Sequence, residues 1–239
     1  KEGLANLAQA ITSPGDIILS PNPSYPIHPY GFIIAGASLR HLPAMDDGIF
    51  NPDFYLERLE RSIIESVPAP VAVIVSFPSN PTAQVVSIEF YEEVVKIALK
   101  YNVYILSDLA YAEIYYDNSP PPSILQIPKA KEVAVEFTSM SKTYAMAGWR
   151  IGFAVGNIRL INALTRIKSY LDYGAFTPVQ VASVAALNGP QDCVIEIRNT
   201  YQKRRDVLIN SMARAGWNIP SPKASMFAWA PIPDKYKDK

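Results

Sequence analysis

Val71-Ala72-Val73-Ile74-Val75 is the stretch of this sequence that decides the fold, because it is apolar without interruption and mostly β-branched. Such a run is typical of a strand that is covered on both faces, as the strands of a parallel sheet are. The chain after Ser87 repeats apolar residues at helical spacing as far as Tyr101, and residues 103–106 are again apolar. A strand, a helix and a second strand in this order predict an α/β sheet with parallel strands.

The alternation of helices and strands continues on both sides of this unit. The spacing of apolar residues predicts further helices over residues 3–11, 52–63, 159–170, 179–187 and 191–215, and further strands over residues 17–19, 133–137 and 151–155. This pattern predicts a layered α/β domain with a largely parallel sheet.

Both ends of the sequence predict a piece of a longer protein. The chain opens at Lys1 without Met or a signal-peptide pattern, in residues that already predict a helix. The apolar stretch Phe227-Ala228-Trp229-Ala230 predicts the first strand of a further unit. We therefore expect a large domain over residues 1–220, without its N-terminal segment, and the start of a truncated small C-terminal α/β domain over residues 221–239.

The composition excludes several classes of protein. Hydrophobic residues make up 49% of the chain and 22 basic side chains balance 22 acidic ones, which is typical of a globular protein. There is no basic stripe for nucleic acid, and no apolar run approaches the ~20 residues that span a membrane. The single cysteine, Cys193, excludes an internal disulfide and fits a reducing compartment, so we expect a cytoplasmic protein. With only His28 and His41 beside it, a zinc site is not expected.

Polar side chains capable of chemistry follow four of the predicted strands. Ligands of parallel α/β sheets bind beyond the carboxyl ends of the strands, so these side chains are expected at one edge of the sheet. They offer an amine, a carboxylate, an amide, hydroxyls and phenols: Tyr25, Asn80, Asp108, Tyr111, Ser139, Ser141 and Lys142.

Lys142 is the candidate for covalent catalysis. A lysine amine attacks a carbonyl only when it is unprotonated, which requires a desolvated or cation-rich setting. Lys142 follows a predicted buried strand and two serines, and Arg150 comes shortly afterwards. A single lysine at such a place is more often an exposed loop residue. Its surroundings here favour a lysine that forms a Schiff base.

Asp108 and its neighbours suit pyridoxal phosphate. A carboxylate at the pyridine nitrogen keeps that nitrogen protonated, so that the ring accepts the electrons of a carbanion. Asp108 supplies a carboxylate, Tyr111 a phenol for the same ring, and Tyr25 an aromatic face that could stack on it. Each residue also has an ordinary structural interpretation, as a cap or turn residue for Asp108 and Asn80 and as packing for the tyrosines.

A second group of side chains is suited to a phosphate. The hydroxyls of Ser139 and Ser141 can donate hydrogen bonds, and the guanidinium of Arg150 can donate a bidentate pair. The predicted helix start at Lys1 would add backbone amides. Alone, each signal is weak, because serines before a lysine are common and an arginine near a strand more often makes a structural ion pair.

The order and spacing of these motifs resemble those of a known family. Asn80-Pro81-Thr82, Asp108 with Tyr111, and Ser139-Met140-Ser141-Lys142 followed by Gly148-Trp149-Arg150-Ile151-Gly152 are similar to class I/II aminotransferases of pyridoxal-phosphate fold type I. The resemblance covers essentially the whole chain. Residues 21–28 and 223–226 look most like the alanine (glutamate–pyruvate) aminotransferases of the AlaC type. The resemblance implies the three-layer α/β/α large domain of these transferases.

The resemblance also implies a role for each candidate. Lys142 would hold pyridoxal phosphate as a Schiff base and later shuttle the substrate proton, and Asp108 would pair with the pyridine nitrogen. Asn80 and Tyr111 would hydrogen-bond the ring's phenolic oxygen, and Tyr25 would stack on the ring, with Asn80 and Tyr25 also bordering the substrate. The phosphate would be held by Ser139, Ser141, Arg150 and Lys1.

The substrates implied are a small amino acid, alanine, and a 2-oxo acid, 2-oxoglutarate, in a homodimer with shared active sites. Thr177 is the candidate for a residue lent across the interface. Family members also have an N-terminal segment that closes over the substrate and a C-terminal arginine that binds its carboxylate, and we expect neither within residues 1–239. We therefore expect the chain by itself to bind the cofactor poorly and to be nearly inactive. Two alternatives stay open, a pyridoxal-phosphate lyase of the same fold and a catalytically silent truncated module.

Overall fold

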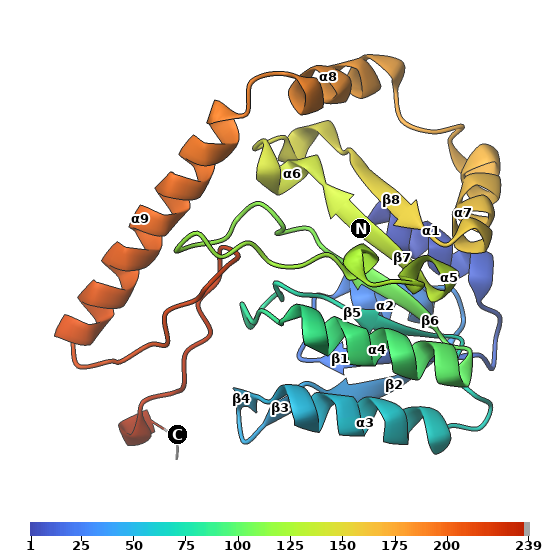
Figure 1. The fold of residues 1–239 in the computed structure, drawn as a ribbon, viewed down its shortest axis with the longest axis horizontal. Coiled ribbons are helices and arrows are strands. Elements are labelled where there is room, and N and C mark those ends of the chain that lie inside the picture. Colours follow the sequence, from blue (N-terminus) through green and yellow to red (C-terminus); the bar gives the residue numbers. More distant parts are fainter. Residues whose placement is uncertain (237–239) are drawn as a thin grey trace.

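The centre of the protein is a six-stranded sheet, described here from a computed structural model that covers residues 1–236 (Figure 1). Its strands run in the order β2-β1-β5-β6-β7-β8. All neighbouring pairs are parallel except β7 with β8. The largely parallel sheet predicted from the sequence is therefore confirmed. The strands are β1 (Ile17–Asn22), β2 (Ser38–Pro43), β5 (Ala72–Val75), β6 (Tyr104–Asp108), β7 (Ala134–Ser139) and β8 (Gly152–Gly156).

Helices cover both faces of this sheet and complete three layers (Figure 1). The side chains of β5 alternate between two cores, with Ala72 and Ile74 in one and Val73 and Val75 in the other. Each core is closed by its own set of helices, because strands buried on both faces need apolar cover on each side. One set is α1 (Glu2–Ile11), α2 (Ile27–Ile34) and α7 (Ile158–Leu171), and the other is α3 (Pro52–Ile64), α4 (Ile88–Tyr101) and α5 (Ala130–Val133).

The helices start where side chains can satisfy free backbone amides. Asn51 accepts hydrogen bonds from the amides of Asp53 and Phe54 at the start of α3. Ser87 accepts one from the amide of Phe90 at the start of α4. Side-chain caps of this kind satisfy N–H groups that have no partner inside the helix. The helix starts predicted after Asn51 and Ser87 are therefore confirmed.

Several elements were not predicted from the sequence. β2 carries mostly exposed or half-buried side chains at the edge of the sheet, so it lacks the apolar run that reveals the inner strands. A small hairpin and short helical turns were also missed. Besides β2, the elements that were not predicted are α2 and α5, whose bounds are given above, and β3 (Met45–Asp46), β4 (Ile49–Phe50), η1 (Ile124–Gln126), α6 (Met140–Thr143), η2 (Ala147–Trp149) and η3 (Asp234–Tyr236).

The strand predicted for residues 227–230 was wrong. The structure shows no strand there, and the ring of Phe227 packs edge-on against Tyr111 with 5.6 Å between centroids. The only pairing nearby is an isolated antiparallel bridge between Tyr115 and Ala224. The apolar run therefore does not form a strand, and one of its large side chains, Trp229, is exposed. A small domain over residues 221–239 stays a prediction, and residues 237–239 lie outside the described part.

Two helices extend away from the three layers. α8 (Thr177–Asn188) and α9 (Asp192–Arg214) form an arm along the top and left of Figure 1. In α9 only Val194 is fully buried, although the helix is 23 residues long. Within residues 1–236 there is no helix both long and apolar enough to cross a membrane.

Candidate active site

The register of the sheet brings the predicted loops to one edge. Asp108 ends β6 and pairs with Phe137 of β7, and Ser139 ends β7 directly beyond. On the other side of β6, Val75 of β5 pairs with Ser107. Because parallel strands end at the same edge, the segments that follow β5, β6 and β7 are neighbours.

Arg150 reaches the same edge by a different route. β8 is antiparallel to β7, and Ser139 pairs with Gly152. Arg150 therefore enters β8 at the end where β7 leaves the sheet. A Cβ atom on Gly152 would lie 2.5 Å from the Thr138 carbonyl oxygen, so only glycine allows this close approach. Arg150 is exposed, and its Nη1 donates a hydrogen bond to the Ala147 carbonyl oxygen at 2.7 Å.

Asp108 is fixed by a buried histidine that the sequence analysis did not assign to the site. Nε2 of His28 lies 2.9 Å from Oδ2 of Asp108, and the amide of Ala110 donates to Oδ1 at 3.2 Å. The His28 side chain is fully buried, whereas that of Asp108 is 17% exposed. The imidazole therefore orients a carboxylate that still faces the edge of the sheet. In the sequence, His28 is the last residue of the motif over residues 21–28 and a polar residue in the apolar segment that forms α2.

Tyr111 carries a phenol that stays protonated. Burial raises the pKa of Tyr111 to about 12, the negative charge of Asp108 adds to the rise, and a hydrogen bond from the Asn80 side chain opposes it. The phenol can therefore donate a hydrogen bond to an anionic oxygen throughout the neutral range. The structure places Asn80, Asp108 and Tyr111 together, as predicted from their positions after β5 and β6.

Tyr25 and the start of α1 lie at the same edge. The ring of Tyr25 meets that of His28 edge-on with 5.9 Å between centroids, and Nζ of Lys1 lies 5.3 Å from the centre of the Tyr25 ring. Through these ring contacts and the hydrogen bond between His28 and Asp108, the side chains of Lys1, Tyr25 and Asp108 lie in one neighbourhood.

Lys142 lies in α6, the short helix that follows β7. The Ser139 hydroxyl caps this helix by accepting a hydrogen bond from the Ser141 amide at 3.2 Å, so the structural interpretation of Ser139 also holds. Lys142 is half-buried, and its amine makes no hydrogen bond or ion pair with residues 1–236.

The pocket beside Lys142 opens toward α9. It has a volume of about 460 Å³ and is lined by Ser141, Lys142, Ala145, Ala147, Glu196, Ile197, Thr200, Tyr201, Arg204 and Met226. Asp108, Asn80 and Tyr111 do not line it. The strands bring Lys142 and Asp108 to the same edge of the sheet. This pocket, however, does not extend from Lys142 to Asp108.

Two other residues singled out from the sequence lie elsewhere. Thr177 is exposed at the start of α8, and Cys193 is an exposed free thiol on α9. A partner subunit's use of Thr177 stays a prediction. Within the described range, no three His, Cys, Asp or Glu side chains gather where they could hold a metal ion.

Comparison with proteins of known sequence identifies relatives along the whole chain. The glutamate–pyruvate aminotransferase AlaC of Escherichia coli is 56% identical over 99% of this chain and 56% of its own length. An LL-diaminopimelate aminotransferase of Moorella thermoacetica is 42% identical over 99% of this chain and 59% of its own length. The chain therefore spans somewhat more than half the length of these relatives.

Solved structures give the same fold. Apo-BacF of Bacillus subtilis has a TM-score of 0.89 at 33% identity, covering 98% of this chain and 61% of its own. The aspartate aminotransferase of Thermus thermophilus with maleate has a TM-score of 0.83 at 28% identity, covering 93% and 57%. The family described as aminotransferase class I and II matches residues 1–239. The chain therefore belongs to the class I and II aminotransferases, a family of pyridoxal-phosphate enzymes.

Proposed function

We propose that this chain carries the cofactor and the reactive lysine of an aminotransferase that moves an amino group between alanine and 2-oxoglutarate. The family supports amino-group transfer. The choice of alanine is supported by the 56% identity to a glutamate–pyruvate aminotransferase, against 42% to an LL-diaminopimelate aminotransferase. The observation that carries the proposal is the meeting of Asp108, Tyr111, Arg150 and the Lys142 segment at one sheet edge.

The side chains at this edge fit pyridoxal phosphate. When bound, this cofactor supplies an aldehyde for the amine and an electron sink for the substrate carbanion. A carboxylate oriented by His28 suits a protonated ring nitrogen, and a protonated phenol with an amide beside it suits an anionic ring oxygen. Two hydroxyls and a guanidinium suit the phosphate. The fit supports Lys142, Asp108, Asn80, Tyr111, Tyr25, Ser139, Ser141, Arg150 and Lys1 as the cofactor residues.

Each of these residues then has a defined task. The Lys142 amine would hold the cofactor and, once released by the amino acid, would carry the proton from the substrate α-carbon to the cofactor. Asp108 would keep the ring nitrogen protonated. Tyr111 and Asn80 would donate hydrogen bonds to the ring oxygen, and Tyr25 would cover the ring face and border the substrate.

The remaining parts of the proposal concern the whole protein. The chain spans somewhat more than half the length of its relatives, so the transamination and the substrates are proposed for the whole protein. Exposed apolar side chains on the α8 arm support a homodimer, in which this surface would be covered: Phe176, Val181 and Val184. Thr177 would contribute from one subunit to the other. The cytoplasmic location stays a prediction.

An assay of the full-length protein against a panel of amino acids tests the function. We expect alanine and 2-oxoglutarate to give pyruvate and glutamate, and LL-diaminopimelate to be a poor donor. Lys142→Ala should abolish the transfer, whereas Lys131→Ala, at an exposed lysine outside the site, should leave it unchanged. Faster transfer from LL-diaminopimelate than from alanine would reject the proposed donor.

The lyase alternative predicts different products. A lyase releases ammonia or a side-chain fragment without needing a 2-oxo acid, because the carbanion is steered to elimination. Product formation that continues when 2-oxoglutarate is omitted would therefore favour the lyase. No turnover by the full-length protein with any donor would favour the silent module.

A further inference from the structure

Two arginines of α9 hold the segment that follows Tyr111. Arg198 donates from Nε to the carbonyl oxygen of Glu113 at 3.0 Å and from Nη2 to its carboxylate at 2.8 Å. Its guanidinium also lies 3.8 Å from the centre of the Tyr115 ring. Hydrogen bonds to backbone and side chain together with a stacked ring fix both the position and the direction of this segment.

Arg205 repeats the arrangement about two helical turns farther along α9. Its Nη1 and Nη2 donate to the two carboxylate oxygens of Asp117 at 2.8 and 3.1 Å, and its guanidinium lies 4.7 Å from the centre of the Tyr116 ring. Nη1 also donates to the Pro222 carbonyl oxygen at 3.3 Å. The Arg205 side chain is only 9% exposed. Arg205 therefore ties Tyr116 and Asp117 to the chain near Pro222.

Both tied segments contact Tyr111. The amide of Ile114 donates to the Tyr111 carbonyl oxygen at 3.1 Å, which holds the Tyr111 backbone in a turn. The amide of Ser225 donates to the Ile114 carbonyl oxygen at 2.8 Å, and Phe227 in the same segment packs edge-on against the Tyr111 ring. The arginines thus act on the backbone of Tyr111 through one segment and on its ring through the other.

We propose that Arg198 and Arg205 are positioning residues, which set where the Tyr111 phenol lies in the aminotransferase site. The inference rests on the proposed function, because it needs the phenol to donate to the cofactor. A hydrogen bond weakens steeply with misalignment, and a displacement of about 1 Å at an active site can cost roughly 100-fold in rate. Neither arginine is among the residues that we assign to cofactor or substrate.

The test uses Arg198→Ala and Arg205→Ala in the full-length protein, with Arg214→Ala as the matched control. Arg214 lies on the same helix, is exposed and donates only to the Ser211 hydroxyl at 3.1 Å. We expect kcat to fall about tenfold in both test variants while the KM for the amino acid changes little. A lysine keeps the positive charge but cannot make the paired hydrogen bonds of a guanidinium. Arg198→Lys and Arg205→Lys should therefore recover only part of the lost kcat.

Two readouts separate positioning from a general structural role. The pH at which the visible band of bound pyridoxal phosphate has changed by half should rise in both variants. The reason is that a displaced phenol stabilises the anionic ring oxygen less. In the cofactor-free protein, hydrogen exchange should quicken in peptides covering residues 111–117 and 223–227 and should not change elsewhere. In a Tyr111→Phe background, the arginine variants should lower kcat no further, because the phenol that they position is already gone.

Wild-type kcat and band midpoint in both alanine variants would overturn the proposal, as would a full additional loss of kcat in the Tyr111→Phe background. If the alanine variants fail to fold, the double variant Glu113→Gln, Asp117→Asn tests the proposal in the same assays. Both carboxylates are partly exposed, so their replacement should leave the protein folded. Wild-type values there would overturn the proposal too. Lack of transfer by the wild-type protein would instead reject the proposed function.

Discussion

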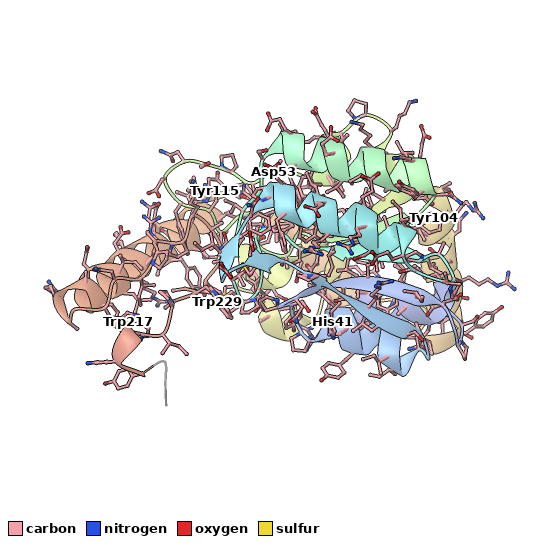
Figure 2. All side chains as sticks on the ribbon, turned by 90° about the horizontal axis from the view of Figure 1, so that it is seen from below. His41, Asp53, Tyr104, Tyr115, Trp217 and Trp229 are labelled. Atoms are coloured by element: carbon pink, nitrogen blue, oxygen red, sulfur yellow. The ribbon has the colours of Figure 1, made fainter. Side chains whose placement is uncertain are left out.

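Nε2 of His28 lies 2.9 Å from Oδ2 of Asp108, although the two residues are 80 positions apart in the sequence. The other histidine, His41, lies on the edge strand β2 (Figure 2). His28 comes from α2 and Asp108 from the end of β6, so this contact forms only when α2 packs against the sheet. A buried imidazole that hydrogen-bonds to a carboxylate holds the carboxylate in one orientation.

Replacing His28 tests the importance of this contact. His28→Ala should weaken binding of pyridoxal phosphate by about 10-fold to 100-fold, because a hydrogen bond to a charged group contributes roughly 1.5–3 kcal/mol. Titration of the cofactor-free full-length protein, followed by its visible absorption, measures the change in Kd. The matched control is His41→Ala, at an exposed residue of β2. Equal Kd values for wild type and His28→Ala would show that Asp108 does not depend on His28.

The raised pKa of Tyr111 predicts a pH dependence of stability. The folded-state pKa of about 12 exceeds the ordinary tyrosine pKa of 10.0, so folding favours the protonated phenol. The corresponding stabilisation is complete below pH 10 and is lost as the pH rises toward 12, because the unfolded chain releases its proton first. Between pH 9 and pH 11, the free energy of unfolding should therefore fall by about 1 kcal/mol less in Tyr111→Phe than in the wild type.

Urea denaturation at pH 9, 10 and 11 measures this difference. Other buried tyrosines, such as Tyr55 and Tyr91, also have raised pKa values, so only the difference between wild type and Tyr111→Phe is informative. Parallel pH profiles for the two proteins would contradict a raised pKa at Tyr111.

Gly152 predicts a stability effect of backbone crowding. A Cβ atom there would lie 2.5 Å from the Thr138 carbonyl oxygen, and that oxygen belongs to the neighbouring strand and cannot move aside easily. Gly152→Ala should destabilise the protein by roughly 1–3 kcal/mol, the usual cost of overpacking. Gly148→Ala is the control, since a Cβ atom there meets nothing within 4 Å. Thermal unfolding of the two variants checks the expectation, and equal Tm values would contradict it.

The inner part of the fold could be predicted because its signals are local. β5 is buried on both faces, so a continuous apolar run revealed it, and the caps Asn51 and Ser87 marked their helices. Edge strand β2 lacks such a run because one side faces solvent. α2 contains Pro29 and Gly31, which are poor helix formers, so the apolar cover of the sheet stabilises it rather than its own sequence.

The site residues that could be predicted from the sequence are those that stand at or shortly after the end of a buried strand. Asn80, Asp108, Tyr111 and Lys142 follow buried strands, and ligands bind at that edge. His28 was missed because its partner is distant in the sequence. The apolar spacing of residues 227–230 was mistaken for a strand because burial of Phe227 against Tyr111 leaves the same pattern.

Locating the covalently bound cofactor tests the central claim most directly. The full-length protein is incubated with pyridoxal phosphate, reduced with borohydride and digested, and the modified peptide is identified by mass spectrometry. Our account predicts that the added mass lies on Lys142 and that Lys142→Ala abolishes both the added mass and the visible band. Stoichiometric modification of a different lysine, or a visible band that persists in Lys142→Ala, would contradict it.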